Sequence, residues 1–134
     1  MKYNGIIENK LRLLEKKTGE IKSWNIKSIV ELQENSMLNN ALERALQVSI
    51  EIMIDISERI LALEKIPPQN FASDSIRKLA ELNIIKDYSK YIDMVKFRNF
   101  IVHRYEYIDL DILFNIAKNK LPYFDDFVNE IRKT

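Results

Sequence analysis

Residues 37–63, MLNNALERALQVSIEIMIDISERILAL, decide the fold, because this long stretch contains neither glycine nor proline. Its apolar and small residues recur at spacings of three and four, which is the period of an α-helix. One stripe consists of Leu38, Leu42, Ala45, Ser49, Met53, Ile56, Ile60 and Leu63, and a second set consists of Leu46, Ile50, Ile54 and Leu61, with Val48 and Ile52. Together the two sets cover more than one face of the helix. We therefore expect a long helix covered on two sides, either at the centre of a bundle or partly by a second copy of the chain.

The segment before this helix also has a helical period. Its apolar stripe is Tyr3, Ile7, Leu11, Leu14, Thr18 and Ile21. This stripe predicts an amphipathic helix over residues 2 to about 22, whose last turn Gly19 weakens. A short second helix is expected within residues 25–34. Asn35 or Ser36 is then expected to cap the long helix.

The long helix is expected to end at residues 66–69, which contain two prolines. Proline lacks an amide proton and disfavours helical geometry in the residue before it. After this loop, Ser73 or Asp74 can cap a short helix that runs through Leu82.

Two more helices are expected in the last third of the chain. The first begins at Asp87 or Ser89, and its core-facing residues are Tyr88, Tyr91, Ile92, Val95 and Val102. The second begins near Asp109, with Pro122 as a kink or a restart. Its apolar stripe is Leu110, Leu113, Ala117, Leu121, Phe124, Val128 and Ile131.

The composition supports this all-helical interpretation. The chain has 134 residues, of which 46% are hydrophobic and 31% are charged, with two glycines and three prolines. Its length suits one domain with one hydrophobic core, and so few helix breakers favour long helices over a sheet with many tight turns. We therefore expect a single domain over residues 1–134, with an all-α antiparallel bundle of about five to six helices and a long central helix.

Charge and residue usage exclude several kinds of function. A net charge of +1 gives no general affinity for nucleic acids, so no DNA binding is expected and any RNA contact must be local. With no cysteine and one histidine, the chain offers no disulfide, no cysteine nucleophile and no metal site, and we expect no cofactor. The absence of a signal-peptide pattern and of a long apolar run predicts a soluble, cytoplasmic protein without membrane contact.

Residues 97–109, FRNFIVHRYEYID, carry the candidate chemistry. Arg98 and Asn99 precede the chain's one histidine, His103, and Tyr105 follows it. Cleaving RNA without a metal needs groups that transfer protons and a cation that offsets the charge growing on phosphorus. Histidine exchanges protons near neutral pH, and arginine offers a planar fork of donors to phosphate oxygens.

The spacing of Arg98 and His103 restricts where the pair can converge. Five positions apart on an ideal helix, their side chains diverge by about 140°. We therefore expect His103 at the helix end or in the turn that follows.

This motif resembles the signature of HEPN ribonucleases, and Tyr105 is similar to the added tyrosine of their HepT branch. Residues 41–47, ALERALQ, continuing to Asp55 and Ile56, resemble the second helix of that family. The proline-containing loop, short helix, motif helix and closing helix follow in the family's order. The resemblance covers nearly the whole chain, most specifically residues 36–130, and implies a single HEPN domain of the HepT-like type.

The resemblance also implies a function, namely the toxin of a toxin–antitoxin system of type II or VII-like organisation. Such a toxin is a metal-independent endoribonuclease, here acting on tRNA or mRNA, with Arg98 and His103 catalytic and with Arg98 and Asn99 binding the RNA phosphate. Its partner is a nucleotidyltransferase antitoxin of the MntA type, which attaches AMP to Tyr105. HEPN domains commonly dimerise so that two motifs line one cleft, so a homodimer is expected.

Structural interpretations compete with each of these roles. A lone histidine near a helix end often caps the helix, and Tyr105 can be an ordinary core aromatic. Asn99 is equally open to either interpretation, and Asp55 is either a buried partner of the motif or a solvent-facing residue. At the level of the whole chain, the alternatives are a non-catalytic binding module that is the partner or substrate of a minimal nucleotidyltransferase, and a purely structural bundle.

Overall fold

The regular structure of this chain is helical throughout the ranges that a computed structural model describes, residues 2–3, 5–103 and 109–134, without the side chains of Val102 and His103. The elements are α1 (Ile6–Trp24), α2 (Ile29–Glu34), α3 (Ser36–Leu63), α4 (Ala72–Glu81), α5 (Ser89–His103), α6 (Leu110–Asn115), the π-helical turn η1 (Ile116–Lys120) and α7 (Leu121–Arg132). No helix in the described ranges is both long and apolar enough to cross a membrane.

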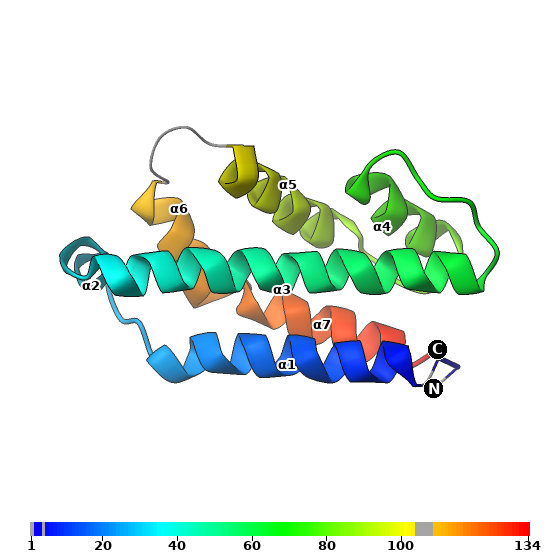
Figure 1. The fold of residues 1–134 in the computed structure, drawn as a ribbon, viewed down its shortest axis with the longest axis horizontal. Helices are drawn as coiled ribbons and strands as arrows, with labels where there is room; N and C mark the ends of the chain where they lie inside the picture. The colour runs from blue at the N-terminus through cyan, green and yellow to red at the C-terminus, as the bar shows by residue number, and fades with distance from the viewer. Residues whose placement is uncertain (1, 4, 104–108) are drawn as a thin grey trace.

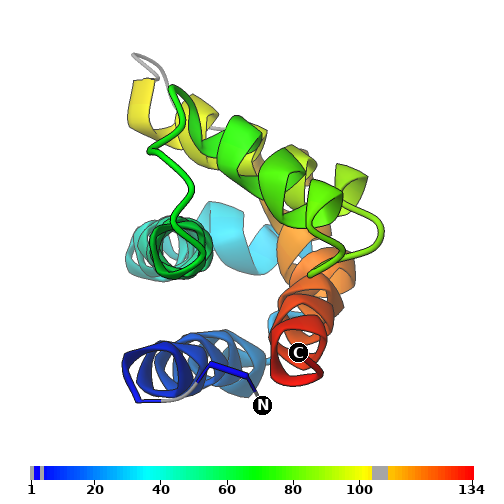
Figure 2. The same ribbon diagram turned by 90° about the vertical axis from the view of Figure 1, so that its right-hand side faces the viewer.

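Four helices form the frame of the bundle and alternate in direction. In the view of Figure 1, α1 and α5 run from right to left, whereas α3 and α7 run from left to right. Helices α1 and α5 each contact both α3 and α7, which closes the ring seen end-on in Figure 2. α4 packs on α3 and α5, and α2 packs on α3 and α6. This confirms the predicted antiparallel all-α bundle, with six helices in the described residues when α6, η1 and α7 are counted as one.

α3 lies at the centre because its two apolar sets have different neighbours. α1 packs against one side of α3, and α4 and α5 pack against another. The buried side chains come from both sets, and include Leu42, Met53, Ile56 and Ile60 from the first and Leu46, Ile50 and Leu61 from the second. Of the two predicted alternatives, the central position in the bundle is therefore the one observed, and no second copy is needed to explain the wide apolar surface.

The first helix is displaced towards the C-terminus relative to the prediction. Tyr3 is buried but precedes the helix, and its hydroxyl donates a hydrogen bond of 2.6 Å to Glu64 at the end of α3. Burial, together with this hydrogen bond, raises the pKa of Tyr3 above its ordinary value. Gly19 does not end the helix, which continues to Trp24 and stops where Asn25 adopts the left-handed conformation (φ 50°).

One predicted helix cap is confirmed and one is wrong. Asn35 caps α3 by accepting a hydrogen bond of 3.1 Å from the amide three residues later. Asp109, near which the sequence predicts the last helix to begin, caps α6 by accepting a hydrogen bond from the amide two residues later. α4 begins at Ala72, so that Ser73 and Asp74 lie inside its first turn. An acidic residue in that turn still interacts favourably with the helix dipole, and so its presence alone does not identify the cap.

The core face of α5 differs from the prediction at one residue. Tyr91, Ile92 and Val95 are buried as predicted, whereas Tyr88 is 39% exposed. Tyr88 immediately precedes the first helical residue, so it does not follow the helical spacing of the others. The fifth predicted core residue, Val102, has a side chain outside the described residues.

The restart predicted at Pro122 is observed, but the irregularity itself lies one turn earlier. η1 interrupts the α-helical hydrogen bonding between α6 and α7, and Pro122 lies in the first turn of α7. In that first turn the missing amide proton of proline is tolerated.

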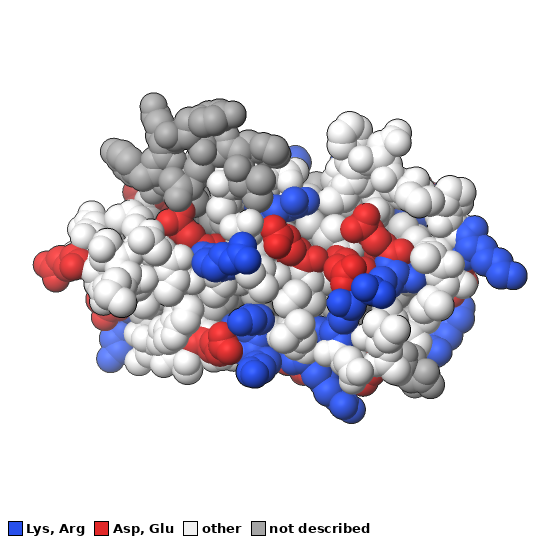
Figure 3. Space-filling model, in the orientation of Figure 1, with Lys and Arg blue, Asp and Glu red and all other residues white. Residues whose placement is uncertain are grey.

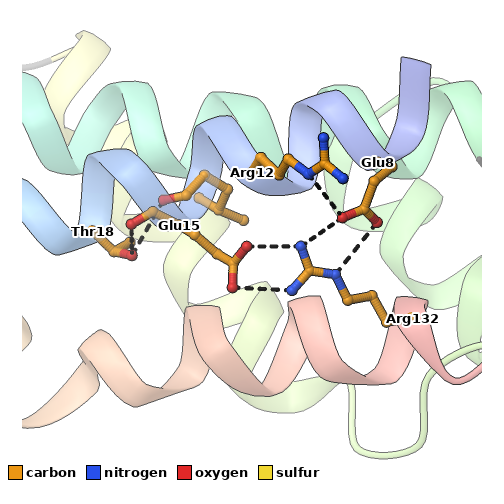
Figure 4. A network of polar contacts seen from close by, with 6 residues as sticks. Glu8, Arg12, Glu15, Thr18 and Arg132 are labelled. Atoms are coloured by element: carbon orange, nitrogen blue, oxygen red, sulfur yellow. Dashed lines mark hydrogen bonds and ion pairs between the residues drawn. The ribbon is translucent and has the colours of Figure 1, made fainter. Parts of the chain in front are cut away.

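Arg132 joins the last helix to the first. Its guanidinium contacts Glu8 at 2.8 Å and Glu15 at 2.7 Å, both on α1, and Arg12 also contacts Glu8 (Figure 4). The hydrogen bonds from Arg132 hold the pKa of Glu8 below its ordinary value. Glu15 and Glu8 in turn raise the pKa of Arg132. This cluster closes the ring of helices where the chain's two ends lie side by side (Figure 1).

Candidate active site

Arg98 lies on the buried face of α5. Tyr91, Met94 and Val95 on this helix are at most 1% exposed. Arg98 follows Val95 by three positions and Met94 by four, so it belongs to the same face of the helix. Its side chain is only half-buried, because it continues a core stripe towards the end of the helix. A charged side chain at such a position is uncommon unless it is paired or functional.

The described residues offer no hydrogen-bond partner to the Nε atom of Arg98. Its Nε is buried and makes no hydrogen bond within residues 5–103 and 109–134. A buried donor without a partner costs about 1–3 kcal/mol, which is tolerated most readily where a ligand supplies the acceptor. Arg98 is therefore available to bind an anion such as a phosphate.

Contacts with α7 hold α5 in place. The hydroxyl of Tyr91 donates a hydrogen bond to Glu130, and its ring meets that of Phe127 edge to face with 5.4 Å between the centroids. One residue earlier, Lys90 pairs with Asp126 at 2.8 Å. Burial, together with the bond to Glu130, raises the pKa of Tyr91 above its ordinary value, so its hydroxyl keeps its proton. These contacts set the rotation of α5 about its own axis, and hence the side of the helix on which Arg98 lies.

The other predicted site residues are described to different extents. Asn99 is exposed and follows Arg98 on α5, so the structure places these two polar residues next to each other. His103 belongs to α5, but its side chain lies outside the described residues, as does all of Tyr105. The convergence of His103 with Arg98 and the position of Tyr105 stay predictions.

Glu43 is a buried acidic residue that the sequence analysis did not single out. It is 9% exposed, and among the residues that the structure describes as buried it is the one with a charged side chain. Glu43 lies in the first half of α3, and the end of α5 lies over this half in Figure 1. Its spacing of three from Leu46 and seven from Ile50 places it on the second apolar set of α3, which is the signal that could have identified it. Buried charges in proteins are paired or hydrogen-bonded, so Glu43 adds a polar element beneath the motif helix.

Asp55 faces α1 instead of the motif helix. Its carboxylate contacts Lys10 of α1 at 2.6 Å and Arg59 of α3 at 3.1 Å. Burial raises the pKa of Asp55, but the hydrogen bonds from Lys10 and Arg59 outweigh it, so the pKa lies below its ordinary value. Asp55 is thus part of a partly exposed ion-pair network, which agrees with the solvent-facing interpretation.

The face formed by α1 and α3 carries no extended patch of one charge. Figure 3 shows that basic and acidic residues are interspersed on the face formed by α1 and α3. In the part of the chain that the structure describes, no three histidine, aspartate or glutamate side chains are grouped so that they could hold a metal ion. The face formed by α1 and α3 therefore offers no extended surface of positive charge to a polyanion.

Comparisons with known proteins extend over almost the full chain. A family model described as Ribonuclease HepT-like matches residues 7–131. The mRNA nuclease HepT of Shewanella oneidensis is 29% identical, over 96% of this chain and 98% of its own length.

Solved structures share the fold. The tri-AMPylated HEPN toxin of Shewanella oneidensis, in complex with an MNT antitoxin, matches with a TM-score of 0.89 at 26% identity, covering 98% of this chain and 100% of that one. A toxin–antitoxin structure with AMP-PNP matches with a TM-score of 0.88 at 25% identity and the same coverage, 98% and 100%. The likeness is therefore not confined to the motif.

Proposed function

The chain belongs to the ribonuclease HepT-like family, and from this premise we propose that it is an endoribonuclease toxin neutralised by a nucleotidyltransferase antitoxin. The likeness to an mRNA nuclease and to a HEPN toxin in complex with an MNT antitoxin supports both parts of the proposal. The observation in this chain that carries it is Arg98, a half-buried guanidinium at a core position of α5 with no described partner for its Nε.

The proposed reaction is a transesterification within the RNA strand. The ribose 2′-oxygen loses its proton and attacks the neighbouring phosphorus, and the bond from phosphorus to the 5′-oxygen breaks. The departing oxygen takes up a proton, leaving a 2′,3′-cyclic phosphate and a 5′-hydroxyl. His103 transfers the protons, Arg98 offsets the charge on the phosphate, and Asn99 donates a hydrogen bond to it. These groups need no metal ion, so cleavage of tRNA or mRNA is expected to continue in chelator.

We further propose that the toxin acts as a homodimer. Two motifs in one cleft would supply two histidines, one to accept the proton and one to donate it, and two arginines for the local positive charge. The support for the dimer is that HEPN domains commonly dimerise. The wide apolar surface of α3 gives no further support, because it is covered within the chain itself.

The test of the nuclease is cleavage of total RNA in chelator by protein that intact-mass analysis shows to be free of AMP. Wild-type protein is expected to cleave and to leave 2′,3′-cyclic phosphate ends. His103→Ala is expected to lower the cleavage rate by at least 100-fold, because general acid–base groups contribute about 10²–10⁴-fold. Arg98→Ala is expected to be similarly impaired, whereas Arg77→Ala, which removes an arginine from a surface pair on α4, should cleave like wild type.

Two results would count against the proposal. Unmodified wild-type protein that leaves all RNA intact would favour the non-catalytic module that a nucleotidyltransferase binds or modifies. Equal cleavage by wild type and His103→Ala would show that the activity comes from another residue or from a contaminating nuclease.

A further inference from the structure

A groove of about 280 Å³ runs between α5 and the kinked helix formed by α6 and η1. Phe97 and Ile116 on its walls are buried, whereas Phe100 and Ile112 are 49% and 46% exposed. Scattered exposed apolar residues are normal on a protein surface, but an aromatic and an aliphatic side chain that together line a concave surface indicate a binding site.

The charges at this groove suit an anionic ligand. Lys96 comes from α5 and Lys120 from η1, and neither forms an ion pair within the described residues. Asp93 is the acidic residue among those lining the groove, so two ammonium groups face one carboxylate. A second copy of the chain seated here would have to bury unpaired ammonium groups, which is costly. An aromatic ring beside free cations is instead the combination that binds single-stranded nucleic acid, where bases stack and phosphates are neutralised.

The groove and Arg98 lie on different sides of α5. Successive residues of an α-helix point about 100° apart, so Phe100 points about 160° away from Arg98 by the shorter way around the axis, and the exposed Asn99 lies on the longer way. An RNA strand on this path has to span the diameter of one helix, on the order of 10 Å. An RNA strand that crosses α5 at Asn99 can therefore place a phosphate at Arg98 and a base in the groove.

The π-helical turn provides a separate indication. Ile116 and Lys120, at the two ends of η1, both line the groove. π-helical turns inside α-helices are rare and occur frequently at functional sites, where they redirect side chains. Here the irregular turn is at the wall that faces Phe100.

We propose that this groove binds an unpaired base next to the cleaved phosphate of the RNA, with Phe100 stacked on the base and Lys96 and Lys120 at the adjoining phosphates. The inference rests on the proposed RNA cleavage and specifies its substrate as single-stranded at the cleaved position, because a base in a duplex is not free to stack on a side chain.

The test measures RNA binding by fluorescence anisotropy, in the His103→Ala background so that the probe stays intact. The probe is a fluorescein-labelled single-stranded RNA of mixed sequence. Phe100→Ala is expected to weaken binding about tenfold, since stacking on one base is worth about 1–3 kcal/mol and about 1.4 kcal/mol corresponds to a factor of ten. Phe100→Trp should keep the affinity, as should Phe71→Ala, which truncates an exposed phenylalanine outside the groove.

The lysines are tested by the salt dependence of binding. Lys120→Ala is expected to weaken binding and to flatten the decrease of affinity with salt, because one phosphate contact is lost. Lys16→Ala, which removes an exposed cation of α1 on the other side of the bundle, should change neither quantity.

Three results distinguish the possible outcomes. Weaker binding by Phe100→Ala, with unchanged sedimentation mass and melting temperature, supports the groove. Unchanged affinity of Phe100→Ala overturns the proposal. A lower sedimentation mass of Phe100→Ala overturns it as well, because the groove would then hold a second copy of the chain. If wild-type protein cleaves no RNA while binding still depends on Phe100, the proposed cleavage fails and the groove stands.

Discussion

At the level of single residues, Arg98 and Glu43 place charged groups where hydrophobic side chains would ordinarily lie. Arg98 continues the core stripe of α5, and Glu43 occupies the second apolar set of α3. Both positions cost stability relative to an apolar side chain, because charge is removed from water. An arginine at a core position is expected where a ligand is bound, so Arg98 favours a functional interpretation over a purely structural bundle.

Tyr105 is the residue at which we expect regulation. We expect Tyr105 to lie near Arg98, so that an AMP group on this tyrosine would compete with RNA for the guanidinium. After incubation with ATP, magnesium and the cognate nucleotidyltransferase, wild-type protein is expected to gain mass in AMP steps and to lose RNA cleavage. Tyr105→Phe should gain no AMP and should keep cleaving, whereas Tyr107→Phe should behave like wild type. Addition of AMP to the Tyr105→Phe protein would place the modification on another residue.

At the level of elements, the first half of α5 is attached to α7, and its second half carries the candidate site residues Arg98 and Asn99. Tyr91 and Lys90 attach the helix to α7, and Arg98 lies two turns later. The orientation of the site therefore depends on side chains that take no part in the proposed chemistry.

Removing the Tyr91 hydroxyl should show how much this attachment contributes. Tyr91→Phe is expected to lower the free energy of unfolding by about 2 kcal/mol, because a hydrogen bond to a charged carboxylate is lost in a buried position. Urea denaturation measures the change, and the slope of the transition should stay the same. Tyr88→Phe is the matched control, since that side chain is partly exposed and makes no described hydrogen bond, and it should change stability by less than about 0.5 kcal/mol. Equal effects of the two substitutions would show that Tyr91 contributes through its ring alone.

At the level of the whole molecule, Arg132 closes the bundle by joining α7 to α1. The pKa of Glu8 is lowered in the folded state, so its contribution to stability is present above the unfolded pKa of glutamate, about 4.3, and is lost as the pH falls through the lower folded value. Arg132→Met removes the partner that causes this shift.

The wild type and Arg132→Met are therefore expected to differ most above pH 5 and to converge below pH 4, as about 1 kcal/mol of stability is lost from the wild type. Melting temperatures across this pH range measure the difference. Arg12→Met, which removes the more exposed of the two arginines at Glu8, should leave the pH profile nearly unchanged. A constant difference between wild type and Arg132→Met at all pH values would mean that Arg132 acts by packing.

The number, order and approximate ends of the helices could be predicted from the sequence, because helical period and capping are local properties of the chain. The same local information identified Arg98, Asn99, His103 and Tyr105 as a motif, although it misplaced Tyr88 and the start of α4. The sequence alone left open what covers the second side of α3 and whether Asp55 belongs to the site. Only the packing of helices decided these points, because they depend on contacts between residues far apart in the chain, such as Lys10 with Asp55. The groove at Phe100 has the same origin, since its two walls come from separate helices and one of them includes a π-helical turn that no local pattern predicted.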